Sequence, residues 1–89
     1  MEIIAHRINN ITKLKDLPKK YGAEIDLRSF KSKIILNHDP FKKGIILEDY
    51  LSNYNHGTLI LNIKESGIEI DVIKIISKFK INFFLLDVE

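Results

Sequence analysis

Short apolar runs alternate with amphipathic segments along the whole chain, and this alternation constrains the fold more than any other feature. Runs of the kind that form strands are separated, in most cases, by segments with helical spacing. The expected strands are Glu2–His6, Ala23–Arg28, Lys33–Asn37, Thr58–Lys64 and Ile81–Asp87. Since helices between consecutive strands favour parallel β/α units, the sequence predicts an α/β chain with a parallel sheet.

Three segments carry helical signals. The clearest is Ile68–Lys80, in which one apolar stripe is formed by Ile68, Val72, Ile75, Ile76 and Phe79. A second helix is expected over Leu47–Tyr54, which has acidic residues in its first turn. A third, shorter helix is expected before Pro18, with Asn9, Asn10 or Thr12 as its N-cap.

The composition is that of a small globular domain, and we expect residues 1–89 to form a single one. Of the 89 residues, 45% are hydrophobic and none is cysteine, which excludes disulfides and cysteine-based zinc sites. The apolar runs are too short to cross a bilayer. Strand-like sequence begins at Glu2 and leaves no room for a signal peptide, so the expected location is the cytoplasm.

Charge is distributed unevenly between the two halves of the chain. Residues 1–43 hold ten Lys and Arg against five Asp and Glu, whereas residues 44–89 hold four against seven. The lysines between residues 13 and 20 are best interpreted as a solvated helix face, although an excess of positive charge also attracts anionic substrates. No aromatic residues lie among these lysines, and a nucleic acid is therefore not the expected partner.

Polar residues with catalytic chemistry lie on or just after the expected strands. His6-Arg7 ends the first strand, Glu24 and Asp26 lie within the second, and His38-Asp39 follows the third. Because side chains alternate along a strand, Glu24, Asp26 and Arg28 share one face, as do Asn62 and Lys64 of a later strand. Buried carboxylates on an ordinary sheet face are unfavourable, which favours a site over a purely structural role.

Each of these residues also has a purely structural interpretation. A single histidine at a strand end is usually structural or solvated, and Glu24 and Asp26 are compatible with an exposed strand face. Arg28 is compatible with an ion pair to one of those carboxylates, and Asn62 with a turn cap. Asp39 is expected to cap a loop or to support His38, and Asp87 and Glu89 are further candidates at the end of the last strand.

The order of these motifs resembles the glycerophosphodiester phosphodiesterase family and its phospholipase C-like relatives. The motifs are His6-Arg7, the run Tyr21-Gly22-Ala23-Glu24-Ile25-Asp26-Leu27-Arg28, then Asn37-His38-Asp39-Pro40 and Asn62-Ile63-Lys64. Members of the family are (β/α)8 barrels, and such barrels need about 200–250 residues. The resemblance therefore implies the first half of a TIM barrel, truncated after Glu89.

The resemblance also implies a role for each residue. His6 and His38 are the expected acid/base pair, because imidazole exchanges a proton near neutral pH. Arg7 and Lys64 are expected to bind the substrate phosphate. A divalent cation, Mg²⁺ or Ca²⁺, is expected on Glu24, Asp26 and Asn62, where Asn62 stands in place of the family's glutamate.

The implied activity is metal-dependent hydrolysis of a glycerol- or sugar-linked phosphodiester, of the kind found in lipid metabolism. Two alternatives remain open at this point. The chain is either a non-catalytic fragment, truncated or split, that needs a homodimer or a second chain to complete the barrel, or a module that binds a phosphate ligand without turnover. An incomplete barrel exposes an apolar strand edge, which favours such pairing.

Overall fold

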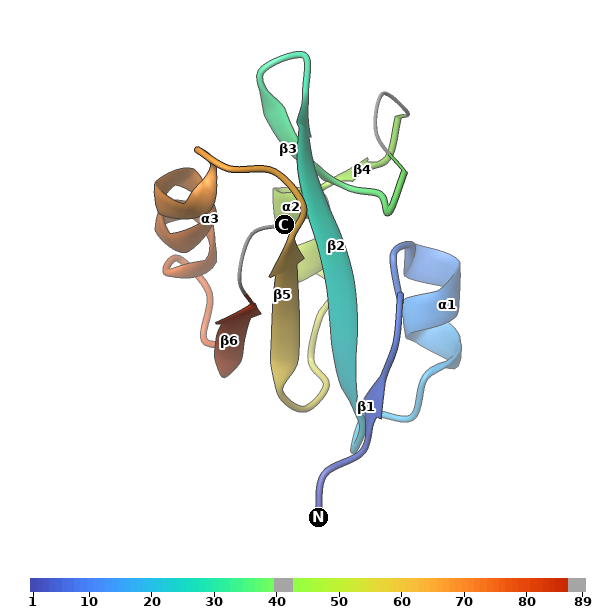
Figure 1. Cartoon of the computed structure of the whole chain (residues 1–89). Helices are drawn as coiled ribbons and strands as arrows, with labels where there is room; N and C mark the ends of the chain where they lie inside the picture. Colours follow the sequence, from blue (N-terminus) through green and yellow to red (C-terminus); the bar gives the residue numbers. More distant parts are fainter. Residues whose placement is uncertain (40–42, 87–89) are drawn as a thin grey trace.

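The strands form one mixed sheet in the computed structural model, which describes residues 1–39 and 43–86 (Figure 1). The strands are β1 (Ile4–Ala5), β2 (Gly22–Phe30), β3 (Lys33–Leu36), β4 (Ile45–Ile46), β5 (Leu59–Ile63) and β6 (Phe83–Leu86). The helices are α1 (Ile11–Asp16), α2 (Leu47–Leu51) and α3 (Glu69–Ile76). The order across the sheet is β4-β3-β2-β5-β6, and β1 pairs with β2.

β2 is the centre of this sheet and is shared by three neighbours. β5 runs parallel to it along one edge, from the Ala23–Leu59 pair to the Leu27–Ile63 pair. On the opposite edge, β1 pairs in parallel with residues 22–23 and β3 pairs antiparallel with residues 27–30. Residues 24–26 therefore face a gap between β1 and β3, visible along β2 in Figure 1.

The predicted parallel half-barrel is wrong. β3 runs antiparallel to β2, and β4 runs antiparallel to β3, although β1, β2, β5 and β6 are parallel to one another. Only Lys31 and Ser32 connect β2 to β3, so this connection has no room for a helix. Over the described residues, the fold is a six-stranded mixed sheet with three short helices, not a repeat of β/α units.

The turn explains why the hairpin was not expected. Lys31 and Ser32 have φ values of +49° and +67°. Two successive positive φ values are typical of a type I′ turn, whose twist matches that of an antiparallel hairpin. Such turns are usually signalled by Asn-Gly or Asp-Gly, and this chain has neither at the turn. The conformation is adopted by residues that disfavour it, so the sequence carries no signal for it.

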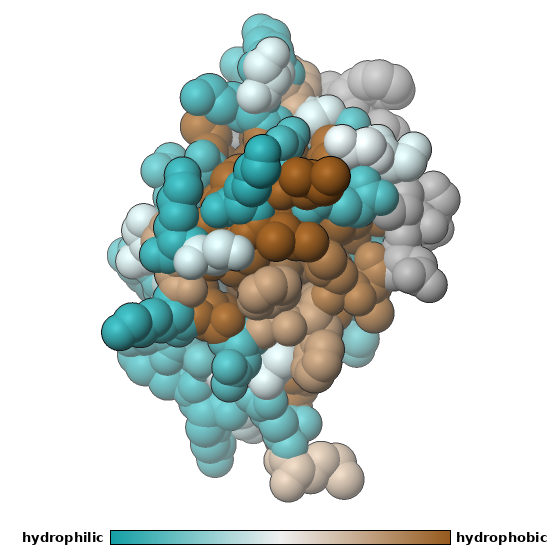
Figure 2. Space-filling view, turned by 90° about the vertical axis from the view of Figure 1, so that its left-hand side faces the viewer, coloured by the Kyte–Doolittle hydropathy of each residue, from teal (hydrophilic) through white to brown (hydrophobic). Residues whose placement is uncertain are grey.

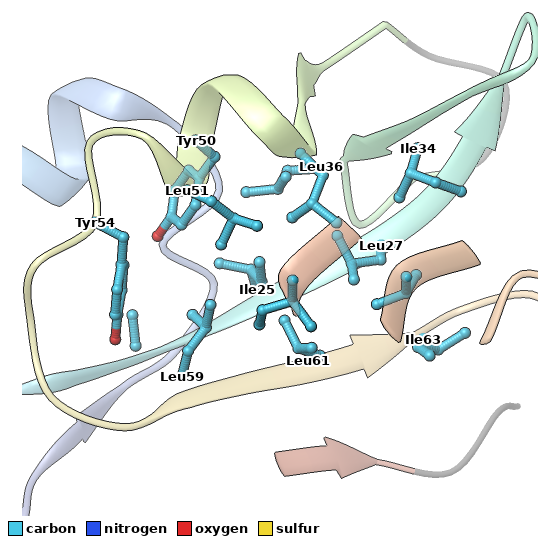
Figure 3. Close-up of a cluster of buried hydrophobic side chains, with 14 of the residues drawn as sticks. Ile25, Leu27, Ile34, Leu36, Tyr50, Leu51, Tyr54, Leu59, Leu61 and Ile63 are labelled. Carbon is cyan, nitrogen blue, oxygen red and sulfur yellow. The ribbon is translucent and has the colours of Figure 1, made fainter. Parts of the chain in front are cut away.

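The hydrophobic core lies on one face of the sheet (Figure 3). Alternate residues of β2 and β5 point into it, and α2 and α3 supply the opposite wall. The fully covered side chains include Ile25, Leu27, Leu59, Leu61, Leu47, Tyr50 and Val72. Each buried Leu or Ile contributes about 1.5–3 kcal/mol, which fixes the register of β2 against β5. Glu24, Asp26 and Asn62 consequently project from the other face.

All three expected helices are present, but each is shorter than the sequence predicts. The apolar stripe of α3 is confirmed, since Val72 and Ile76 are both buried. The N-cap of α1 is Asn10, whose side-chain oxygen accepts a hydrogen bond from the Lys13 backbone N–H at 2.8 Å. Asn9, which was an equal candidate for the cap, is free to bond elsewhere.

The last strand, β6, lies at the edge of the sheet. Its Phe84 is 65% exposed. Figure 2 shows a broad apolar area on this side of the molecule, where α3 and β6 lie. Exposed apolar side chains on these two elements are Ile70, Ile73, Phe84, Leu85 and Leu86.

The expected homodimer or second chain that would complete a barrel stays a prediction. The expectation that residues 1–89 form a single domain also stays a prediction.

The sequence also predicts that no segment spans a membrane, and it adds Asp87 and Glu89 as candidate site residues. Within residues 1–39 and 43–86, no helix has the length and apolar character that a membrane span requires. The cytoplasmic location itself stays a prediction. Asp87 and Glu89, the additional site candidates, lie outside the described residues.

Candidate functional site

The gap on the edge of β2 is filled by the segments that follow β1 and β3. The Ile8 backbone N–H donates to the Glu24 carbonyl at 2.9 Å, and the Asn37 backbone N–H donates to the Asp26 carbonyl at 3.0 Å. The Asp26 N–H donates to the side-chain oxygen of Asn9 at 2.9 Å. These three bonds bring two segments that are distant in sequence to the same stretch of β2.

His6 and Arg7 bulge out of the ladder at this place. Ala5 pairs with Ala23, and in a regular parallel ladder the Arg7 N–H would then bond to the Glu24 carbonyl. Ile8 makes that bond instead, so one extra residue is accommodated on the side of β1. Arg7 has a φ of +53°, a left-handed conformation that costs a non-glycine residue about 1–2 kcal/mol. Strain of this kind is often retained at functional sites.

His6 is paired with an anion. Its Nδ1 lies 3.0 Å from Oε1 of Glu24, with side-chain exposures of 81% for His6 and 16% for Glu24. A carboxylate can only accept, so we assign the proton of this hydrogen bond to Nδ1 of His6.

His38 is paired with a cation. Nη2 of Arg7 lies 3.0 Å from Nε2 of His38. A guanidinium can only donate, so Nε2 of His38 presents its lone pair and the proton of the neutral ring lies on Nδ1. Nδ1 faces Oδ1 of Asp39 at 3.4 Å, as expected for a residue that supports His38. His6 is thus held by a carboxylate on Nδ1, whereas His38 has a guanidinium on Nε2 and a carboxylate near Nδ1.

Asp26 is the buried carboxylate of the site, with an exposure of 1%. Its Oδ2 accepts a hydrogen bond from the Asn9 amide at 2.9 Å, and its Oδ1 lies 4.0 Å from Nζ of Lys64. Asn62 is its register partner on β5, so the two side chains project from the same face. The structure therefore brings Asp26, Asn62 and Lys64 together as predicted, and adds Asn9.

The oxygen set predicted to hold a cation does not fit one in this arrangement. Over the part of the chain that the structure describes, no three His, Cys, Asp or Glu residues are grouped in a way that could hold a metal ion. A cation on Asp26 would share it with the Lys64 ammonium and would displace the amide of Asn9. Mg²⁺ and Ca²⁺ both prefer several oxygen ligands, and Asn62 brings no charge. The structure does not test whether Mg²⁺ or Ca²⁺ binds; this arrangement predicts weak binding, and no chemical step is derived from a cation.

Two residues of the site are absent from the sequence prediction. Asn9 binds Asp26 through both atoms of its amide, although it was read only as a helix cap. A signal exists, since two adjacent asparagines precede a helix that needs only one N-cap. Arg28, for which the sequence offers only an ion pair with Glu24 or Asp26 as one interpretation, donates to the carbonyls of His38 and Lys64.

A separate hollow of about 300 Å³ lies at the opposite end of the sheet, around Thr58 and His56. The Glu2 carboxylate accepts hydrogen bonds there from the backbone N–H and the hydroxyl of Thr58, both at 2.6 Å. These polar groups already satisfy one another, and none of the predicted site residues lines the hollow. The gap on β2 is therefore the stronger candidate.

Comparisons with protein-family models, with curated proteins and with solved structures each give no match.

Proposed function

We propose that the side chains gathered around the gap on β2 bind a phosphodiester and hydrolyse it, with His38 as the general base and His6 as the general acid. The observation that carries this proposal is the opposite pairing of the two imidazoles, His6 with Glu24 and His38 with Arg7, each at 3.0 Å. Acid/base hydrolysis needs one group that accepts a proton and one that supplies it. The resemblance of the motifs to glycerophosphodiester phosphodiesterases supports the choice of substrate class.

Phosphate binding is the first step. A phosphate oxygen competes with the His38 ring for the Arg7 guanidinium, because a charged acceptor forms the stronger hydrogen bond. The movement of Arg7 from Nε2 of His38 to the phosphate releases the lone pair of that nitrogen. Lys64, with a side chain that is 12% exposed, adds positive charge beside Asp26. Substrate binding in this way activates the base.

Hydrolysis then follows from the two imidazoles. Nε2 of His38 takes a proton from the nucleophile, a water molecule or a hydroxyl of the substrate itself. The nucleophile's oxygen forms a bond to phosphorus, and the bond from phosphorus to the leaving oxygen breaks. The imidazolium of His6 gives its Nε2 proton to that leaving oxygen, while Glu24 remains bonded to Nδ1. Proton transfer between the two rings through solvent restores the starting state.

Binding without turnover is the second candidate, and one observation favours it. The His6 side chain is 81% exposed, and an open site excludes water poorly. In that case Arg7 and Lys64 hold a phosphate ligand, and the two histidines contribute hydrogen bonds alone. A phosphodiester that binds and is never cleaved is the expected result for this candidate.

The test is turnover of a chromogenic phosphodiester, bis(4-nitrophenyl) phosphate, by the purified chain. We expect His6→Ala and His38→Ala each to lower kcat by about 100-fold or more. His56→Gln is the matched control, because His56 contacts the Leu17 carbonyl away from the gap and is expected to leave kcat unchanged. Turnover that is unaffected by His6→Ala would sink the hydrolase proposal.

A further inference from the structure

Arg28 joins two segments of the candidate site through their backbones. Its Nε and Nη2 donate to the His38 carbonyl at 3.2 and 3.0 Å, and its Nη1 reaches the Lys64 carbonyl at 3.4 Å. Arg28 lies on β2 and shares a face with Asp26, two residues before it. One planar guanidinium therefore spans the residues that follow β3 and β5.

Both carbonyls lie beyond the regular sheet. β3 ends at Leu36 and β5 ends at Ile63, so the carbonyls of His38 and Lys64 lie past the last paired residues of these strands. The Lys64 N–H still donates to the Leu27 carbonyl at 3.0 Å, which leaves its own carbonyl one residue past the pairing. A guanidinium has five donors in a fixed plane and can satisfy both carbonyls together, whereas a lysine ammonium is a single point.

We propose that Arg28 is the positioning residue of this site, and that it sets the distance between the base, His38, and the phosphate-binding Lys64. This inference rests on the proposed function. The carbonyl contacts of Arg28 use three of its nitrogen atoms, so its guanidinium is directed at the backbone and not at the substrate. It acts on the reaction through the two residues that it holds.

The neighbouring contact provides a matched control. Ser29 donates to Glu65 from its backbone N–H at 2.9 Å and from its hydroxyl at 2.6 Å. This pair ties the end of β2 to the segment after β5, as Arg28 does, but it does not reach His38. Ser29→Ala removes one of the two bonds and is expected to leave the position of His38 unchanged.

The experiment compares Arg28→Lys with Ser29→Ala and the wild type. Arg28→Lys keeps the positive charge but loses the planar arrangement of donors that reaches both carbonyls. We therefore expect kcat to fall by about 100-fold, the cost of a small misplacement of a catalytic group. In the free protein we expect the imidazole NMR signals of His38 to shift and those of His6 to stay. If Arg28→Lys keeps wild-type kcat and wild-type His38 signals, the positive charge suffices and the positioning role is overturned.

A measurement on the wild type covers the case in which Arg28→Lys does not fold. We expect the Nε–H of Arg28 to exchange with solvent at least about tenfold more slowly than in the free amino acid, because it is held by the His38 carbonyl. Exchange at the free rate overturns the positioning role. A wild type that neither binds inorganic phosphate nor cleaves the diester refutes the proposed function instead, while the exchange rate still tests the contact.

Discussion

Glu65 accepts two hydrogen bonds from Ser29 and thereby fastens the segment after β5 to the end of β2, with the shorter contact at 2.6 Å. The Ser29 hydroxyl and the Ser29 backbone N–H, in that order, hold the pKa of Glu65 below its ordinary value of 4.5. The contact therefore belongs to the ionised carboxylate. It lies directly beside Arg28, at the end of the sheet that carries the candidate site.

The first prediction concerns stability in acid. Because the pKa of Glu65 is lower in the folded chain, its stabilisation is complete above the unfolded value of 4.5 and is lost as the pH falls through the folded value. Glu65→Gln should lower the free energy of unfolding by about 0.5 kcal/mol at neutral pH, a small effect because the group is exposed. Urea unfolding at neutral and acidic pH measures it.

Glu48→Gln, on the exposed side of α2, is the control for that comparison. The difference in unfolding free energy between neutral and acidic pH should become smaller in Glu65→Gln than in Glu48→Gln. Equal differences in the two variants would show that the Ser29 contact does not stabilise the fold.

A second prediction concerns the turn between β2 and β3. Lys31 and Ser32 both have positive φ values, which glycine and asparagine tolerate far better. Replacing them together, Lys31→Asn with Ser32→Gly, should raise the free energy of unfolding by about 1–2 kcal/mol. Thermal and urea unfolding measure the gain. Ser32→Ala keeps the strain and should give none, and an equal gain in that variant would contradict the turn geometry.

A third prediction concerns alkaline pH. Burial raises the pKa of Tyr54 from 10.0 to about 12, and its hydroxyl donates to the Gly57 carbonyl at 2.7 Å. A raised pKa means that the stabilisation is complete below pH 10.0 and is lost as the pH rises toward 12. Tyr54→Phe should cost about 1 kcal/mol near neutral pH and lose less stability than the wild type between these limits. An unchanged pH dependence in Tyr54→Phe would contradict this assignment.

A fourth prediction concerns divalent cations. Both oxygens of Asp26 face groups of the protein, the Asn9 amide and the Lys64 ammonium, and Glu24 is bonded to His6. We therefore expect no saturable binding of Mg²⁺ or Ca²⁺ below about 1 mM. Amide NMR titration of each chloride salt measures binding at Asp26 and Asn62. Saturation at micromolar cation would show that the three oxygens rearrange into a metal site.

The core and most of the strands were predictable from the sequence because they depend on periodicity. The nearly continuous apolar run of β5 and the apolar stripe of α3 predict buried elements whatever the rest of the chain does. The direction of β3 was not predictable, because it depends on a turn made by Lys31 and Ser32. Tertiary packing imposes this turn against the local backbone preference of both residues. Neither Lys nor Ser is a residue type that signals such a turn.

The sequence could predict which residues belong to the candidate site, but not how they pair with one another. His6, Glu24, Asp26 and His38 do lie together, beside the stretch of β2 that β1 and β3 leave unpaired. Their pairing was not predictable, because it depends on the gap that β1 and β3 leave on the edge of β2. Arg28 illustrates this limit, since its partners are backbone carbonyls that no residue type identifies.

The central claim is that the two imidazoles are held in opposite roles, and nitrogen NMR of the ¹⁵N-labelled histidines at neutral pH tests it most directly. We predict that His38 carries its proton on Nδ1 with Nε2 unprotonated, and that inorganic phosphate perturbs Nε2 as Arg7 moves away. His6 should remain protonated at Nδ1, bonded to Glu24. A His38 ring protonated at Nε2, or a His6 ring without a proton on Nδ1, would contradict the account.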